Sequence, residues 1–341
     1  MNQRVYPWQQ PTWENLFQGS GTLPHGIILA GRKGLGKLHF ARQLARALLC
    51  ENRREGGPGI PCGQCPSCHW LASGSHPDLR VLEPEILRKP DDVSPESGPR
   101  GSDKKPSSQI PVDDVRELHE FLQMTSHRGK NKVVLVHPAD SLTVSAANAL
   151  LKNLEEPPPR TVFILVAHRL AALLPTVRSR CRILTMPAPA QDVALAWLRD
   201  QGIANPELSL ALAGGAPLGA LAAGEEAQAR RSVLLKRIAA GHFSPVQLAE
   251  ELRDYTPENL VHYLHTWAID LIYWKYSKRI VYNLDFADPI AQQAECAPER
   301  GLLRFQRQLG LWRRTVEHPL NTRLFAEQVL MSYADVMAGK A

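Results

Sequence analysis

Four of the six cysteines crowd into a short part of the chain with the spacing of metal ligands. Cys50, Cys62, Cys65 and Cys68 form a C-x11-C-x2-C-x2-C pattern. Four thiolates are the number that a closed tetrahedral zinc site requires, and such a site leaves no open position for a reacting water. We therefore expect a structural Zn²⁺ that contributes to folding and rigidity and takes no part in catalysis.

Other ligand sets fit this segment less well. The three closely spaced cysteines resemble part of an iron–sulfur run, but the fourth cysteine lies upstream of them and does not follow with a proline. His69 could replace a cysteine as a ligand, and the thiols could also stay without metal. The spacing favours zinc over an iron–sulfur cluster and over thiols without metal.

A glycine-rich segment at residues 31–37, GRKGLGK, matches a phosphate-binding loop as far as its lysine. In such a loop, backbone N–H groups at a helix N-terminus converge on a polyphosphate, and Lys37 would neutralise charge. The next residue is Leu38, whereas a Ser or Thr hydroxyl normally binds Mg²⁺ there. We do not expect ATP hydrolysis at this loop, although the sequence leaves weak nucleotide or phosphate binding open. The candidate phosphate-binding residues are Gly31, Gly34, Gly36 and Lys37.

The carboxylates that would complete an ATPase site are also missing. An acidic pair is expected where a neighbouring core strand ends, but the strand predicted at Lys132–Val136 is followed by a His-Pro dipeptide. Asp140, slightly further on, could reach a metal, but capping of the following turn explains it better. Glu155 and Glu156 close a predicted helix and are expected to be a solvated helix end.

Arginines alternate in the segment Arg178-Ser-Arg-Cys-Arg182, and no acid lies between Arg160 and Arg182. Unpaired arginines suit phosphate recognition. Arg180 could therefore stabilise charge on a neighbouring subunit's nucleotide. From the spacing alone, a solvated or DNA-facing basic loop is an equally good interpretation.

The surrounding pattern predicts a doubly wound α/β domain with a parallel sheet, followed by a helical region. Strand and helix signals alternate up to residue 187, and strand signals nearly vanish beyond residue 191. A segment at residues 88–109, rich in Pro, Ser, Gly and charges, is expected to be a mobile loop. Strands are predicted at 26–30, 78–82, 132–136 and 162–167, and helices at 37–50, 112–125 and 145–155.

Composition agrees with a folded soluble protein. The 341 residues are 44% hydrophobic and carry a formal net charge of +6, too small an excess to prove an anionic partner. The sequence has no apolar run of membrane-spanning length and no secretion signal at its start. A cytoplasmic location without a membrane partner is expected.

Several motifs together give the chain a close resemblance to a known family. The run SAANALLKNLEEP at residues 145–157, the Ser-Arg-Cys at 179–181, the degenerate loop and the cysteine cluster resemble the delta-prime family of bacterial DNA polymerase III clamp-loader subunits. The segments YPW at 6–8 and HPD at 76–78 are similar too. The resemblance spans most of residues 1–190.

The resemblance implies a fold, partners and roles for individual residues. The fold would be an AAA+ (P-loop NTPase-like) module with a zinc insertion at residues 1–187, a helical lid at 188–228 and a helical collar at 229–341. The collar would join five subunits in an open ring with tau/gamma and delta, located with the replisome at the nucleoid. Arg180 would act in trans as the arginine finger on a tau/gamma ATP, so that the ring loads a sliding clamp on primed DNA.

Departures from the motor subunits of that family imply an inactive ATP site. Those subunits carry Ser or Thr after the loop lysine, an Asp-Glu pair after the core strand and an arginine in the lid helix. This chain has Leu38, the His-Pro dipeptide and Leu218 in those places. We expect no autonomous enzymatic activity, only participation in the polymerase holoenzyme. The alternatives are an ATP-hydrolysing motor subunit and, from the pI near 9.0 and the cysteines, a zinc-dependent DNA-binding protein.

Overall fold

The computed structural model describes residues 5–18, 23–52, 59–88, 106–128, 130–316 and 321–340. Most of the loop predicted at 88–109 lies outside these residues. The chain divides into two compact units, Met1–Val193 and Ala194–Ala341. The finer division into a module, a lid and a collar stays a prediction.

A five-stranded parallel sheet in the order β2-β3-β4-β1-β5 forms the centre of the first unit. Every residue of the three central strands is buried, which explains why they are nearly continuous apolar runs. The four predicted strands are confirmed. The fifth was not predicted; like β2 it is a short edge strand, but none of its residues is buried. The strands are β1 (Gly26–Ala30), β2 (Leu79–Leu82), β3 (Lys132–Val136), β4 (Thr161–Ala167) and β5 (Arg182–Thr185).

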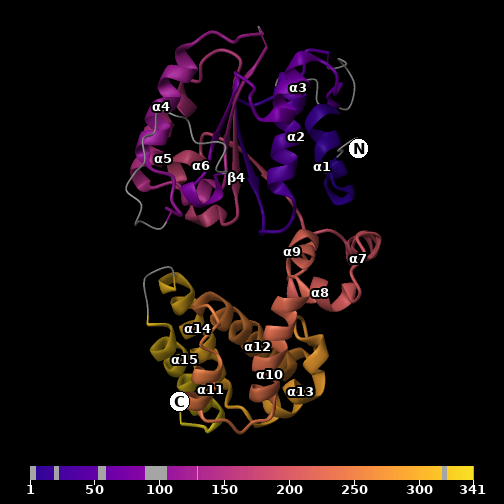
Figure 1. Cartoon of the computed structure of the whole chain (residues 1–341), viewed down its shortest axis with the longest axis vertical. Helices are drawn as coiled ribbons and strands as arrows, with labels where there is room; N and C mark the ends of the chain where they lie inside the picture. The colour runs from indigo at the N-terminus through magenta and orange to yellow at the C-terminus, as the bar shows by residue number, and fades with distance from the viewer. Residues whose placement is uncertain are drawn as a thin grey trace. The chain divides into compact units, whose positions relative to one another are not determined.

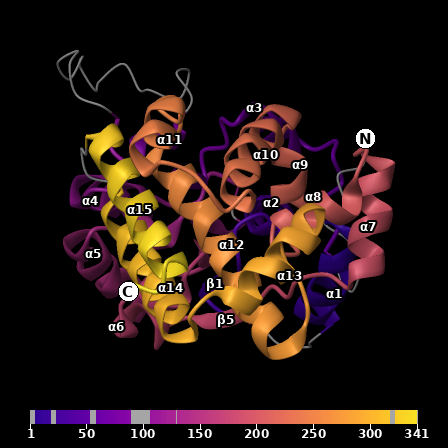
Figure 2. The same ribbon diagram turned by 90° about the horizontal axis from the view of Figure 1, so that it is seen from below.

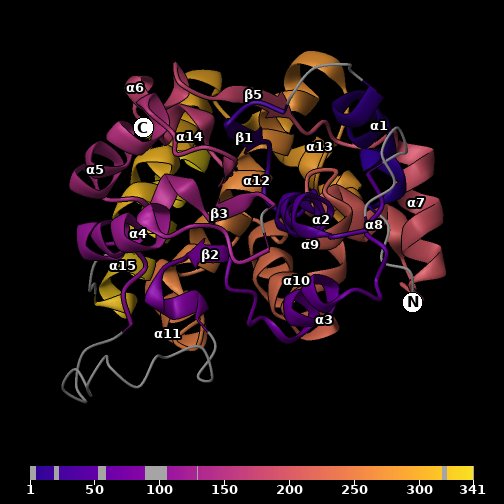
Figure 3. The ribbon, with the colours of Figure 1, turned by 90° about the horizontal axis from the view of Figure 1, so that it is seen from above.

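Helices cover both faces of this sheet, as Figures 1 and 3 show. Two separate hydrophobic cores result, one on each face. One face carries α1 (Gln10–Gln18), α2 (Lys37–Leu49) and α3 (Pro66–Ser73), and the other carries α4 (Val112–Gln123), α5 (Val144–Glu155) and α6 (Pro175–Arg178). The three helices predicted in this unit are confirmed, and the α/β class with them.

The register of the strands decides which loops can meet. Ile27 of β1 lies beside Ile164 of β4 and Arg182 of β5. The segments that follow β1, β3 and β4 therefore meet at the carboxyl edge of the sheet. The residues before β5 lie at the opposite, amino edge.

The second unit is helical throughout its described residues. Helix α12 is its centre, with α14 and α15 on one side and α13 on the other (Figure 2). Trp267 of α12 is fully buried in the larger core, while α7, α8 and α9 share a small core of their own. None of the described helices is long and apolar enough to cross a membrane. From the end of the first unit onward the helices are α7 (Gln191–Asp200), α8 (Pro206–Leu212), α9 (Pro217–Ala222), α10 (Glu225–Ala239), α11 (Pro245–Glu251), α12 (Pro257–Ser277), α13 (Ala287–Cys296), α14 (Glu299–Thr315) and α15 (Thr322–Met337).

Candidate functional site

The glycine-rich loop connects β1 to α2 at the carboxyl edge of the sheet, where a phosphate-binding loop belongs. Gly34 and Gly36 have φ angles of +86° and +83°, a region that favours glycine. Gly36 is also closely covered, because a Cβ there would lie 2.7 Å from both Gln9 Nε2 and Tyr6 Cδ2. Only glycine therefore fits at position 36.

The loop lysine is turned onto its own loop. Lys37 Nζ donates hydrogen bonds to the carbonyl oxygens of Gly31 and Arg32, both at 2.6 Å. The residue is 2% exposed, and this burial lowers the pKa of its amine to about 8. In this conformation the loop carbonyls occupy the donors that would otherwise meet a phosphate.

The N-terminal arm, η1 (Pro7–Gln9) and α1, packs against the same loop. Trp8 Nε1 donates to the carbonyl oxygen of Leu35 at 3.1 Å, and Gln9 Nε2 donates to the same oxygen at 2.9 Å. Tyr6 stacks on Trp8 with ring centroids 4.9 Å apart. The arm therefore packs on the body of the first unit and covers the loop from outside.

Two histidines at the carboxyl edge were missed as a pair from the sequence. His137 directly follows β3 and His168 directly follows β4, and their rings lie 5.6 Å apart. Burial, with a smaller contribution from nearby positive charges that include Lys37, lowers both pKa values to about 4. Both imidazoles are neutral at physiological pH and cannot act as the missing carboxylates. Their positions after adjacent strands were the signal that could have found them.

Asp140 has a structural role at this edge. Its Oδ1 accepts a hydrogen bond from the His168 backbone N–H at 2.8 Å, and its Oδ2 lies 3.8 Å from Arg169 Nε. The carboxylate thus joins the segments after β3 and β4, whereas the sequence indicated a cap on the following turn. With Leu38 in place of a hydroxyl, these residues do not fit productive Mg²⁺–ATP chemistry.

The four clustered cysteines come together in space. Their Sγ atoms all lie within 4.8 Å of one another, and the Cys50–Cys65 and Cys62–Cys68 pairs are each 4.0 Å apart. Tetrahedral zinc with Zn–S bonds of about 2.3 Å requires sulfur atoms about 3.8 Å apart. The cluster can therefore hold a metal ion, and its donor set and spacing suit zinc.

The backbone around the cluster favours a thiolate at Cys62. Cys65 is the N-cap of α3, where the helix dipole stabilises negative charge. Cys62 Sγ accepts N–H hydrogen bonds from Gln64 and Cys65, and these bonds help lower the pKa of its thiol to about 7. Metal ligands must be deprotonated, so this local structure prepares Cys62, whereas burial raises the pKa of the Cys50 and Cys68 thiols. His69 is not part of the group.

Arg180 lies far from the glycine-rich loop, in the turn between α6 and β5 at the amino edge of the sheet. A Cβ on Gly26, the first residue of β1, would lie 3.2 Å from the Arg180 carbonyl oxygen and 2.8 Å from Cys181 Sγ. The loop begins at the other end of the five-residue β1, about 17 Å away at 3.3 Å per residue. Arg180 therefore cannot serve a phosphate held by its own loop.

The side chain of Arg180 has partners that the sequence did not predict. It forms an ion pair with Glu155, the last residue of α5, and its Nη1 donates to the Thr176 carbonyl oxygen at 2.9 Å. The absence of acids from 160 to 182 suggested an unpaired arginine, but the partner comes from the preceding helix. Glu155 is half exposed, so the expectation of a solvated helix end was incomplete.

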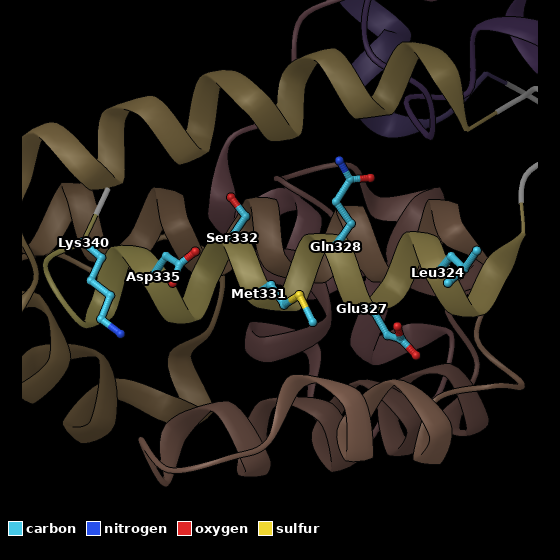
Figure 4. A pocket seen from close by; sticks show the side chains of 7 residues that line it. All are labelled: Leu324, Glu327, Gln328, Met331, Ser332, Asp335 and Lys340. Atoms are coloured by element: carbon cyan, nitrogen blue, oxygen red, sulfur yellow. The ribbon is translucent and has the colours of Figure 1, made fainter.

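A surface pocket on the second unit gathers no comparable chemistry. It encloses about 440 Å³ along α15, and Figure 4 shows the side chains that line it. Its charged groups are two carboxylates and one amine, among amide, hydroxyl and apolar groups. The lining residues are Leu324, Glu327, Gln328, Met331, Ser332, Asp335 and Lys340.

The strand order, the glycine-rich loop between β1 and α2, and the helical second unit define an AAA+ module with a cysteine insertion. The family model described as "DNA polymerase III, delta subunit" matches residues 9–190. DNA polymerase III subunit delta' of Pseudomonas aeruginosa is 41% identical over 63% of this chain, and that of Escherichia coli is 33% identical over 85%. The chain belongs to the delta-prime family of DNA polymerase III subunits.

Coverage of the relatives differs. The alignment spans 60% of the P. aeruginosa protein, less than two thirds of its length, and 83% of the E. coli protein. Among solved structures, a gamma subunit-related protein of Thermotoga maritima is 17% identical, with a TM-score of 0.40 over 96% of this chain and 99% of that one. That likeness is too distant to bear on function.

Proposed function

We propose that this chain is the non-hydrolysing delta-prime subunit of a clamp loader, which supplies Arg180 in trans to the ATP of a neighbouring tau/gamma subunit. The position of Arg180 carries the proposal. It lies at the opposite end of β1 from the chain's own loop, so a phosphate that it contacts belongs to another molecule. A guanidinium offered in this way stabilises the charge that develops during phosphoryl transfer.

The glycine-rich loop supports the non-hydrolysing part. Lys37 is bound to two loop carbonyls, Leu38 offers no Mg²⁺ ligand, and neutral His137 follows β3 in place of an acid. Leu218, in α9, has no charge to offer a phosphate. We infer that this site does not turn over ATP and that the subunit works through its neighbours.

The family membership supports the wider role. Together with tau/gamma and delta, the subunit would complete a ring that loads a sliding clamp on primed DNA. The four cysteines Cys50, Cys62, Cys65 and Cys68 would hold a structural Zn²⁺ in the same unit. A closed site of this kind adds rigidity and has no part in the reaction.

Reconstitution with tau/gamma and delta tests this function. Clamp- and DNA-stimulated ATP hydrolysis is measured for the wild type, for Arg180→Ala and for Arg182→Ala, an exposed arginine two residues away that serves as the matched control. We expect Arg180→Ala to assemble normally and to lower the stimulated rate at least tenfold, with Arg182→Ala unchanged. An Arg180→Ala loader with wild-type turnover, or ATP hydrolysis by the isolated chain, would overturn the proposal.

A further inference from the structure

The contacts of Arg180 hold its guanidinium from one side. Nη2 is paired with the Glu155 carboxylate, and Nη1 donates to the Thr176 carbonyl oxygen at 2.9 Å and to Ser179 Oγ at 3.3 Å. The side chain remains 33% exposed. The guanidinium is thus fixed in direction while the side chain stays partly exposed, and its Nε is buried without a hydrogen-bond partner.

The position of Glu155 is not explained by the stability of its own helix. It is the last residue of α5, where the negative end of the helix dipole disfavours a carboxylate. The positive charge of Arg180 offsets this cost. The C-terminus of the helix alone would favour a positive side chain at position 155. A carboxylate at this position therefore indicates that Glu155 serves Arg180.

The ion pair is also anchored at both ends. The segment of Arg180 is pressed against Gly26 of β1, and the carbonyl of Leu154, next to Glu155, lies 3.1 Å from His25 Nε2. His25 immediately precedes β1. Both members of the ion pair are therefore held next to the start of β1, at the amino edge of the sheet.

We propose that Glu155 is a positioning residue that holds the Arg180 guanidinium in one direction before it meets a neighbour's nucleotide. The inference rests on the proposed function of Arg180. A long arginine side chain loses rotamer freedom when it binds a phosphate, and a side chain that is already restrained loses less. The carboxylate thus lowers the cost of forming the contact in the assembled ring.

The test uses the reconstituted loader with Glu155→Ala, Glu155→Gln and Glu156→Ala. Glu156 is the matched control because it is exposed, adjacent and acidic but has no contact with Arg180 among the described interactions. The contact is partly exposed, so we expect Glu155→Ala to lower kcat for ATP by about two- to fivefold. The kcat of Glu155→Gln should lie between those of Glu155→Ala and the wild type. Glu156→Ala should keep the wild-type kcat. None of the variants should change the KM for ATP or the assembly of the loader.

A second readout measures the arginine itself. In the isolated chain, the NMR relaxation and hydrogen exchange of the Arg180 Nε–H group report how tightly it is held. Both should show greater mobility in Glu155→Ala than in wild type or Glu156→Ala. Unchanged mobility would refute the positioning role whatever the ATPase shows.

The outcomes separate this inference from the function on which it rests. If Arg180→Ala lowers turnover while Glu155→Ala does not, the finger stands and the positioning role is refuted. Faster turnover with Glu155→Ala would mean that the carboxylate holds the arginine back, which also refutes it. If Arg180→Ala has no effect, both fail. The double variant should match Arg180→Ala alone, because Glu155 acts only through Arg180.

Discussion

The indole nitrogen of Trp8 donates a hydrogen bond to the carbonyl oxygen of Leu35, and this contact fastens the N-terminal arm to the glycine-rich loop at 3.1 Å. The same carbonyl accepts a second hydrogen bond from Gln9. Both hydrogen bonds belong to the packing of the fold.

Trp8→Ala should therefore destabilise the whole first unit. Trp8 is buried, and removal of a buried tryptophan side chain costs about 3 kcal/mol of unfolding free energy. Gln9→Ala should cost about 1 kcal/mol through the lost hydrogen bond. Urea unfolding measures both. Gln10→Ala, one residue on and only partly buried, should stay within about 0.5 kcal/mol. A Trp8→Ala chain as stable as wild type would show that the arm does not pack on the loop.

The lowered pKa of Lys37 gives stability a defined pH dependence. The Lys37 amine has a pKa of about 8 in the folded chain, and the usual pKa of lysine, 10.5, applies to the unfolded chain. Between these values the unfolded chain holds a proton that the folded chain has lost, so the free energy of unfolding rises with pH. We expect a rise of about 1–3 kcal/mol across this window.

Urea unfolding from pH 7.5 to pH 10.5 checks this, with Lys37→Met as the variant that loses the rise. Lys33→Met is the control, because Lys33 belongs to the same loop but is exposed. Its pH profile should keep the wild-type slope. If the free energy of unfolding rose equally with pH in all three proteins, the titrating group would not be Lys37.

The cysteine cluster predicts a stoichiometric metal. Cys65→Ser replaces a buried cysteine of the cluster, so zinc content should fall from one per chain to a small fraction and the thermal midpoint should drop by several degrees. Elemental analysis and calorimetry measure the two effects. Cys296→Ser, an exposed cysteine outside the cluster, should change neither. Full zinc content in Cys65→Ser would refute the four-thiolate site.

Acid should release the same metal. Protons compete with zinc for the thiolates, so a chain at falling pH loses metal and then stability. Chelator treatment at neutral pH should give the same unfolding midpoint as acid release, removal of the freed zinc by dialysis and return to neutral pH. A midpoint indifferent to both treatments would mean that the metal does not support the fold.

Much of the fold was predictable because its signals are local. The strands β1, β3 and β4 are apolar runs because both of their faces are buried. The leucines of α5 recur at helical spacing because one face of that helix is buried. The cysteines are close in sequence, so their proximity in space followed from spacing. Strand β5 was missed because an exposed edge strand of four residues carries no such pattern.

The contacts that shape the site were not predictable in the same way. Arg180 meets Glu155 only because α5 and α6 lie on the same face of the sheet, and no local pattern encodes that. Likewise, His137 and His168 meet through the register of β3 and β4, and Lys37 binds carbonyls that any glycine-rich loop would have. Sequence indicated which residue types could do chemistry, and tertiary structure decides which of them are already engaged.

Gly26 gives the last prediction, because it sets how closely the arginine segment approaches β1. A Cβ at this position would meet Cys181 Sγ at 2.8 Å and the Arg180 carbonyl oxygen at 3.2 Å. Gly26→Ala should therefore destabilise the chain by about 1–3 kcal/mol through overpacking. Removal of the sulfur with Cys181→Ala should restore part of this loss, since the carbonyl contact remains. A cycle of the two single variants and the double variant, measured by urea unfolding, should give a coupling of at least about 0.5 kcal/mol.

Gly310→Ala is the control with the opposite sign: a Cβ there meets nothing within 4 Å inside helix α14, so the change should stabilise the chain by about 0.5–1 kcal/mol. Additive effects of Gly26→Ala and Cys181→Ala would mean that the segment does not press on β1, and the fixed placement of Arg180 would lose its structural basis.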